Sequence, residues 1–301
     1  MIHYDECPVC AAKTISAKFV VKDYTVTGEE YMLKQCAHCS FVFTQDIPSQ
    51  DEIGKYYASQ NYISHSSTQK GLVNNLYHRV RKFTLTSKRR LVSRETGVAT
   101  GNLLDVGCGT GAFLDEMRSA GWKITGLEPD ETARKNAASL FNIHPQPSQD
   151  LFQLPDESFD AISMWHVLEH VHQLHEYVAQ LSKLLKPGGR IFIAVPNYTS
   201  ADADHYQRFW AAFDVPRHLY HFSPDSMKLL MNKHGLEVKK IKPMWFDSFY
   251  VSMLSEQYKH NKARLIPAFI TGLWSNIKAL FNQERCSSLI YIIGKADQAG
   301  N

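Results

Sequence analysis

Residues 103–113 read LLDVGCGTGAF, an apolar run that changes abruptly into three closely spaced glycines. The apolar residues before Gly107 predict a strand, and those after Gly111 predict a helix. Glycines at such a junction let the backbone turn sharply and approach a ligand, and the first turn of the helix offers unpaired amide groups. The segment therefore predicts a nucleotide-like ligand at the carboxyl end of a strand.

The same strand–helix alternation continues along the chain. Strands are expected at residues 102–107, 123–129, 159–165, 190–196, 236–244 and 287–296, and helices at 112–121, 131–141, 171–185 and 223–235. Alternation of this kind predicts an α/β fold with a doubly wound, mostly parallel sheet, for which we expect seven strands. Ligands of such folds bind at the carboxyl ends of the strands.

Two kinds of nucleotide ligand are compatible with the glycines. Gly107-x-Gly109-x-x-Ala112 matches the dinucleotide fingerprint, and Glu128 is suitably spaced to accept hydrogen bonds from ribose hydroxyls. Asp105 favours another ligand, because a carboxylate beside the loop would repel a pyrophosphate and attract an ammonium group. S-adenosylmethionine carries an ammonium group, a ribose and an adenine but no phosphate. The sequence therefore favours it, and an NAD oxidoreductase would require another role for Asp105.

The segment from Asp105 to Gly111 resembles motif I of the class I S-adenosylmethionine-dependent methyltransferases. The resemblance extends over residues 101–197 and includes SQDLFQLPDESFDAI at 148–162 and LLKPGGRIFIAVPN at 184–197. It implies S-adenosylmethionine as the cofactor, with Asp150 contacting the adenine amino group and Leu151 packing beside the ring. The residues that it places in the donor pocket are Asp105, Gly107, Gly109, Gly111, Phe113, Glu128, Pro129, Asp150, Leu151, Trp165 and His166.

Residues 166–170, HVLEH, match the H-x-x-E-H pattern of a zinc-peptidase helix. A peptidase also needs a third metal ligand and a glutamate aimed at the metal-bound water, and we identify no third ligand in the sequence. We expect a helix from residue 167 onward, with Glu169 pointing away from its apolar stripe and with His172 and His175 solvated. The candidate bases for deprotonating a methyl acceptor are His166, His170, His218 and His221.

Two C-x-x-C pairs lie near the start of the chain, separated by 25 residues: Cys7, Cys10, Cys36 and Cys39. Four thiolates on two tight turns suit tetrahedral zinc, and the alternating segments at 18–26 and 30–36 predict a connecting hairpin. The alternative is two disulfides, but the absence of a recognisable secretion signal favours a reducing cytoplasm. We expect a structural Zn²⁺, because four protein ligands leave no open coordination position.

The predicted organisation has three parts: a zinc-ribbon-like segment at 1–48, a helical linker or cap at 49–98, and a methyltransferase domain at 99–301. Cap insertions are expected around 198–222 and 247–284. Residues 264–281 are interpreted as an amphipathic helix that covers the core, and no membrane span is expected. Between residues 79 and 90 the linker has six basic residues, interpreted as a solvated face or as a surface for phosphorylated or nucleic-acid substrates: Arg79, Arg81, Lys82, Lys88, Arg89 and Arg90.

The acceptor is less well defined. A net charge of +3 neither requires nor excludes nucleic acid. Residues 209–231, FWAAFDVPRHLYHFSPDSMKLLM, resemble a subgroup with N-terminal cysteine pairs, some of whose members act on sugars or other small metabolites. Residues weighed either for acceptor binding or for ordinary packing and ion pairing are Tyr198, Arg208, Trp210, Phe213, Arg217 and Tyr220.

We therefore expect a cytoplasmic enzyme that methylates oxygen or carbon of a small metabolite, such as a sugar or sugar nucleotide. An RNA methyltransferase that grips nucleic acid with the ribbon and the basic linker is the second hypothesis. A donor-binding module without catalysis is the third.

Overall fold

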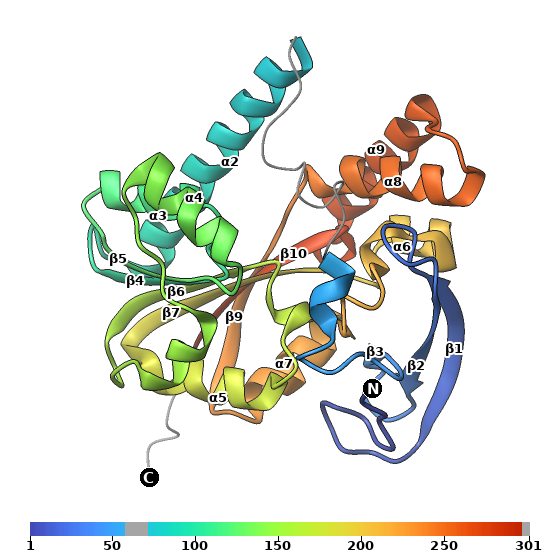
Figure 1. Ribbon diagram of the computed structural model, residues 1–301, viewed down its shortest axis with the longest axis horizontal. Helices are drawn as coiled ribbons and strands as arrows, with labels where there is room; N and C mark the ends of the chain where they lie inside the picture. Colours follow the sequence, from blue (N-terminus) through green and yellow to red (C-terminus); the bar gives the residue numbers. More distant parts are fainter. Residues whose placement is uncertain (58–71, 297–301) are drawn as a thin grey trace.

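The computed structural model describes residues 1–57 and 72–296, with the backbone alone for residues 72–81. The described chain contains a six-stranded sheet in the order β5-β4-β6-β7-β10-β9 and a four-stranded sheet in the order β1-β2-β3-β8 (Figure 1). The larger sheet consists of β4 (Asn102–Val106), β5 (Lys123–Leu127), β6 (Phe159–Trp165), β7 (Leu185–Pro196), β9 (Leu236–Pro243) and β10 (Ser288–Lys295).

The larger sheet confirms the predicted doubly wound fold. Strands β5, β4, β6 and β7 pair in parallel, and β10 runs antiparallel between β7 and β9. The described sheet has six strands rather than the expected seven. Beyond β5, Gln146 forms only an isolated parallel bridge with Leu127. Pro145 and Pro147 flank Gln146 and have no amide hydrogen to extend the pairing, so a full strand does not form there.

Helices cover both faces of the larger sheet (Figure 1). They are α2 (Leu72–Thr96), α3 (Ala112–Ser119) and α4 (Glu131–Phe141) on one face, and α5 (Leu174–Leu184) and α7 (Pro224–Asn232) on the other. Successive residues of a strand point to opposite faces. Leu103 accordingly belongs to the core with Leu114 of α3, and Leu104 to the core with Leu181 of α5.

The smaller sheet connects the cysteine-bearing segment to the rest of the molecule. It consists of β1 (Ile15–Lys22), β2 (Glu30–Cys36), β3 (Val42–Thr44) and β8 (Tyr220–His221). Strand β3 pairs antiparallel with β8, so the N-terminal hairpin and a segment almost 180 residues later share one sheet. Phe41 and Phe43 are fully buried in the same core cluster as Leu104 and Leu230. Residues 1–48 therefore pack directly on the domain that carries the glycine loop.

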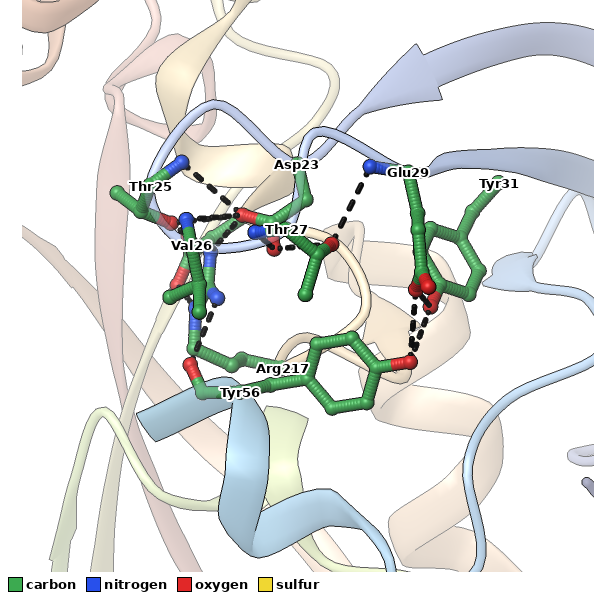
Figure 2. Close-up of polar contacts among 9 residues, drawn as sticks. Asp23, Thr25, Val26, Thr27, Glu29, Tyr31, Tyr56 and Arg217 are labelled. Atoms are coloured by element: carbon green, nitrogen blue, oxygen red, sulfur yellow. Dashed lines mark hydrogen bonds and ion pairs between the residues drawn. The ribbon is translucent and has the colours of Figure 1, made fainter. Parts of the chain in front are cut away.

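A buried ion pair attaches the loop between β1 and β2 to the same domain (Figure 2). Arg217 lies 3.0 Å from Asp23 and 2.6 Å from Asp214, and it donates a hydrogen bond of 2.9 Å to the carbonyl of Tyr56 in the short helix η1 (Ile53–Tyr57). It also donates to the hydroxyl of Thr25. The guanidinium is thus surrounded by protein acceptors, which supports the ion-pairing role considered for Arg217 over binding of an anionic acceptor.

The insertions near the C-terminus form a helical layer. It contains α6 (Ala201–Tyr206), the short helices η5 (Gln207–Phe209), η6 (Ala211–Phe213) and η7 (Gln283–Arg285), and α8 (Asp247–His260) and α9 (Leu265–Phe281). Residues 264–281 form the expected helix, but the large apolar side chains of this helix do not cover the core. Instead, α9 buries small residues such as Ala268 and Gly272. Its large apolar side chains point outward, and Phe281 is 88% exposed. A Cβ on Gly272 would lie 2.9 Å from Phe249, so close packing of α8 and α9 requires the small face.

Within the described residues, no helix is both long enough and apolar enough to cross a membrane.

Candidate functional site

The glycine loop joins β4 to α3 at the carboxyl edge of the larger sheet. Gly107, Gly109 and Gly111 have φ angles of +72°, +55° and +79°, in the left-handed region that favours glycine. A Cβ on Gly107 would lie 2.4 Å from the side chain of Val167, whereas one on Gly109 would meet no heavy atom within 4 Å. Packing therefore requires glycine at position 107, and the space beside Gly109 is open for a ligand.

Glu128 lies at the end of β5, across the loop. One of its carboxylate oxygens accepts a 2.8 Å hydrogen bond from the amide of Gly109, and the other accepts a 3.0 Å bond from the amide of Asp130. Burial raises the pKa of this carboxyl group. The backbone thus orients Glu128 toward the loop, with lone pairs left for ligand hydroxyl groups.

Asp105 lies one residue before the end of β4, in a position that favours a cationic ligand. Its carboxylate is 1% exposed and accepts a 2.5 Å hydrogen bond from the hydroxyl of Ser163 on β6. Burial raises the pKa of Asp105 to about 7, although the charge of Lys88 acts in the opposite direction. A buried carboxylate with one neutral hydrogen-bond partner gains stability from a nearby positive charge, as the ammonium group of an amino acid would provide.

Lys88, on α2, lies beside Trp165 and Asp105, a position that the sequence did not reveal. Its ammonium lies 4.1 Å from the centroid of the Trp165 ring. Burial lowers the pKa of Lys88 to about 8, while the charges of Asp105 and Asp247 oppose that shift. The buried indole N–H of Trp165 has no hydrogen-bond partner among the described residues. An ammonium group, an unpaired indole donor and a buried carboxylate fit the zwitterionic end of an amino-acid ligand such as S-adenosylmethionine.

The remaining predicted donor residues lie around this centre, and their roles stay predictions. The ring of Phe113 packs edge-on against Trp165, with centroids 5.4 Å apart. Pro129 is exposed, and its carbonyl accepts a 2.8 Å hydrogen bond from Arg134. Asp150 and Leu151 are in the short helix η3 (Ser148–Gln153), where Asp150 is half-buried and Leu151 fully buried.

The HVLEH segment is not part of a long helix. His166 has a φ of +58°, residues Leu168–His170 form the short helix η4, and α5 begins only at Leu174. The helical expectation for residue 167 onward is therefore wrong, because left-handed backbone at His166 and extended backbone at Val171 interrupt the turn. The helical spacing of a zinc-peptidase motif does not form.

His166 lies between two carboxylates. Its Nε2 is 3.3 Å from Asp247, and its Nδ1 is 3.5 Å from Glu169. Burial by itself lowers the pKa of His166, but the two carboxylates outweigh burial and raise it to about 9. A histidine with this pKa holds its proton at neutral pH, which favours a hydrogen-bond donor over the base considered for His166.

Glu169 is fully buried, although it was expected to point away from the apolar stripe of a helix. His166, His170 and His218 surround it, and one potential ligand atom from each of Glu169, His170 and His218 lies within 4.8 Å of the others. His218 is therefore the third metal-capable residue that the sequence did not reveal. Three of the four candidate histidines meet here, whereas His221 contacts Thr44 at 3.2 Å inside the smaller sheet.

Other expectations about exposed side chains are also corrected. His172 and His175 are not simply solvated, because they contact the carbonyls of Pro48 and Pro8 at 3.0 and 2.8 Å and so attach the N-terminal segment.

The aromatic side chains considered for the acceptor pocket are each at most 9% exposed and pack in the core: Tyr198, Trp210, Phe213 and Tyr220. Arg208 is exposed.

The four N-terminal cysteines form one cluster. Their sulfur atoms lie within 4.8 Å of one another, with 3.6 Å between Cys7 and Cys39 and 3.5 Å between Cys10 and Cys36. All four are free thiols, so the disulfide alternative is not formed. Thiolates around a tetrahedral zinc lie roughly 3.8 Å apart, and the cluster fits that arrangement.

Comparisons with known proteins agree with this architecture. A family model described as a methyltransferase domain matches residues 77–241, more than half of the chain. A demethylmenaquinone methyltransferase of Tropheryma whipplei (strain Twist) is 29% identical over 134 residues, covering 43% of this chain and 56% of the relative. A ubiquinone biosynthesis O-methyltransferase of Sodalis glossinidius is 32% identical over 114 residues, covering 36% and 46%. The chain thus spans about half the length of these curated relatives.

A solved structure shows the same fold. The 1,6-didemethyltoxoflavin-N1-methyltransferase of Burkholderia thailandensis is 14% identical, with a TM-score of 0.50, and the match covers 87% of this chain and 98% of that enzyme. At this identity the similarity concerns the fold alone. The sheet order, the glycine loop and the family match together lead to one assignment: the chain belongs to the methyltransferase-domain family and has the class I, S-adenosylmethionine-dependent methyltransferase fold.

Proposed function

We propose that the protein is an S-adenosylmethionine-dependent methyltransferase that acts on oxygen or carbon of a small metabolite. The observation that carries this proposal is the pairing of opposite charges at the donor end of the sheet. Buried Asp105 on β4 and Lys88 on α2 interact beside Trp165, close to the glycine loop and Glu128. These groups match the carboxylate, the ammonium and the ribose hydroxyls of a zwitterionic amino acid joined to a ribose.

S-adenosylmethionine supplies an activated methyl group on its sulfonium. In the proposed site Asp105 binds the ammonium group, Lys88 the carboxylate and Glu128 the ribose hydroxyls. The family resemblance adds Asp150 at the adenine amino group and Leu151 beside the adenine ring. Alignment of the acceptor with the methyl group is the main task of such a site, because displacement at the sulfonium occurs in line. His166, at the end of β6, would orient an acceptor oxygen by donating a hydrogen bond.

The relatives and the resemblance of residues 209–231 support a small metabolite as the acceptor. The named relatives include an O-methyltransferase of ubiquinone biosynthesis and a demethylmenaquinone methyltransferase, which supports a small-molecule acceptor. Sugars or sugar nucleotides remain the acceptors suggested by residues 209–231. The RNA hypothesis loses support, because Lys88 is directed to the donor site and Arg89 pairs with Glu116 at 2.8 Å. The side chains of Arg79 and Arg81 lie outside the described residues.

We further propose that Cys7, Cys10, Cys36 and Cys39 hold a structural Zn²⁺. Their separations fit four thiolates around one ion, and a fourth protein ligand closes the coordination sphere. Free thiols in this arrangement are compatible with a reducing compartment such as the cytoplasm. The predicted division into a ribbon at 1–48, a linker at 49–98 and a catalytic domain at 99–301 remains part of this proposal.

Calorimetric titration with S-adenosylhomocysteine, with NAD in parallel, tests the donor site. We expect one-to-one binding of S-adenosylhomocysteine, loss of that binding in Asp105→Asn, and normal binding in Asp156→Asn, a control at an exposed aspartate. Binding of NAD instead, or no binding of either ligand, would contradict the proposal. Transfer of labelled methyl groups from S-adenosylmethionine to phenolic quinone precursors or to sugar nucleotides would then identify the acceptor class. No transfer to either class would leave a donor-binding module without catalysis.

A further inference from the structure

Glu169, His170 and His218 each carry an atom that can bind a metal ion, and these three atoms lie close together. Glu169 comes from the short helix η4, His170 follows it, and His218 comes from the segment before β8. One potential ligand atom of each lies within 4.8 Å of the others, and the rings of His170 and His218 meet edge-on with centroids 4.6 Å apart. Residues almost 50 positions apart thus converge on one small volume.

Backbone carbonyls favour the same tautomer in both histidines, although Nδ1 of His170 also lies 3.1 Å from the hydroxyl of Tyr57. Nδ1 of His170 donates a 2.9 Å hydrogen bond to the carbonyl of Arg217, and Nδ1 of His218 donates a 2.8 Å bond to the carbonyl of Ala212. In a neutral ring the proton then lies on Nδ1, so Nε2 carries a free lone pair. Donation from the second ring nitrogen to a carbonyl is the usual way in which proteins orient histidine ligands of metal ions.

The buried carboxylate of Glu169 makes the cluster electrostatically unfavourable unless a cation other than His166, which is shared with Asp247, binds there. Its side chain is fully buried, and neither carboxylate oxygen has a hydrogen-bond partner among the described residues. His166 approaches one oxygen at 3.5 Å, but its other nitrogen faces Asp247 at 3.3 Å. Nearby Arg217 is paired with Asp23 and Asp214. A buried carboxylate between two imidazole rings, with a distant and shared histidine as its nearest donor, still has a high desolvation cost.

We propose that Glu169, His170 and His218 bind a divalent transition-metal ion at a site separate from the cysteine cluster. Two imidazole nitrogens and one carboxylate suit Zn²⁺, Mn²⁺, Fe²⁺ or Co²⁺ better than Ca²⁺ or Mg²⁺, which favour all-oxygen ligands. Three protein ligands leave coordination positions open, in contrast to the four cysteines. The site adjoins His166 at the end of β6, and its existence does not depend on the proposed methyl transfer.

Cobalt titration of the full chain tests the site directly, after removal of any affinity tag and after loading with a single equivalent of zinc, which the four cysteines take first. We expect the protein to bind one further equivalent of Co²⁺, with ligand-field absorption but no thiolate-to-cobalt charge-transfer band. Glu169→Gln and His218→Asn should each weaken this binding at least roughly tenfold. His144→Gln, at an exposed histidine, should leave it unchanged and serves as the matched control.

The proposal fails if the zinc-loaded protein takes up no further Co²⁺, if the added Co²⁺ shows thiolate bands, or if both variants bind Co²⁺ like the control. The stoichiometry and spectrum of the unmutated protein decide the question even if one variant does not fold. S-adenosylhomocysteine binding measured in the same samples reports the donor site separately. Loss of donor binding therefore cannot be mistaken for loss of the metal site.

Discussion

The guanidinium of Arg217 lies 3.0 Å from the carboxylate of Asp23, which is 194 residues earlier in the chain (Figure 2). Neither side chain has more than 1% of its surface exposed. This pair connects the loop of the N-terminal hairpin to the segment that carries His218. The cysteine-bearing hairpin and the candidate site therefore depend on each other for stability.

Replacing Arg217 by Met should destabilise the protein by about 3–5 kcal/mol, because Asp23 and Asp214 would lose the cation between them. Urea unfolding followed by circular dichroism measures the change. Arg208→Met, at an exposed arginine nine residues earlier, is the control and should change stability by less than about 0.5 kcal/mol. Equal stability of the two variants would show that the ion pair contributes nothing.

The contribution of Asp23 should also depend on pH. Burial by itself raises the pKa of Asp23, but hydrogen bonds from Arg217, Thr27 and Thr25 outweigh burial and hold the pKa well below its usual value. A carboxylate with a lowered pKa in the folded state stabilises the protein above its unfolded pKa and loses that contribution as the pH falls. The stability difference between the wild type and Asp23→Asn should therefore shrink between about pH 6 and about pH 3. A pH-independent difference would contradict this.

Two glycines of the loop have different roles: Gly107 allows close packing against Val167, and Gly109 leaves space for a ligand. Alanine at position 107 or 109 costs about 1–2 kcal/mol for its left-handed backbone. Gly107→Ala should cost roughly 1–3 kcal/mol more, because its Cβ would lie 2.4 Å from Val167. Gly109→Ala should fold with the smaller loss, yet bind S-adenosylhomocysteine more weakly, because its methyl group enters the open space. Thermal unfolding and calorimetry distinguish these effects, and normal donor binding by Gly109→Ala would refute the assignment of that space.

Lys88→Met tests recognition of the donor carboxylate. The variant should bind S-adenosylhomocysteine about tenfold to a hundredfold more weakly, because a charged hydrogen-bond partner is lost. Binding of 5′-methylthioadenosine, which lacks the amino-acid carboxylate, should not change. Lys82→Met, at an exposed lysine on the same helix, controls for loss of charge alone. Equal weakening of both ligands would mean that Lys88 only supports the fold.

Removal of the proposed zinc should affect the whole domain. Because β3 pairs with β8 and Phe43 lies in the shared core, chelation or Cys7→Ser should lower the temperature of one cooperative unfolding transition and reduce donor binding with it. Metal analysis should find zinc lost from Cys7→Ser but retained in Cys286→Ser, whose cysteine lies outside the cluster. A separate early transition with intact donor binding would show that the ribbon is an independent unit.

The central fold was accessible from the sequence to a large extent. Residues 131–141 and 159–165 have the helix and strand bounds that their patterns predict, and the glycine loop lies between β4 and α3 as expected. The expectation for Glu169 was wrong, because helical periodicity was extended through a segment whose backbone turns left-handed at His166. Lys88 was missed because a lysine in a basic run carries no local sign of a buried partner.

The sequence by itself determined the strand–helix alternation, the glycine loop with its acidic neighbours, and the two C-x-x-C turns. These features arise from interactions within a few residues, so hydrophobic period, backbone freedom and ligand spacing reveal them. Only the tertiary structure decided that β3 pairs with β8, that Arg217 neutralises Asp23, and that His218 joins Glu169 and His170. Each of these contacts links distant segments, and a local pattern contains no information about which distant side chain will share its burial.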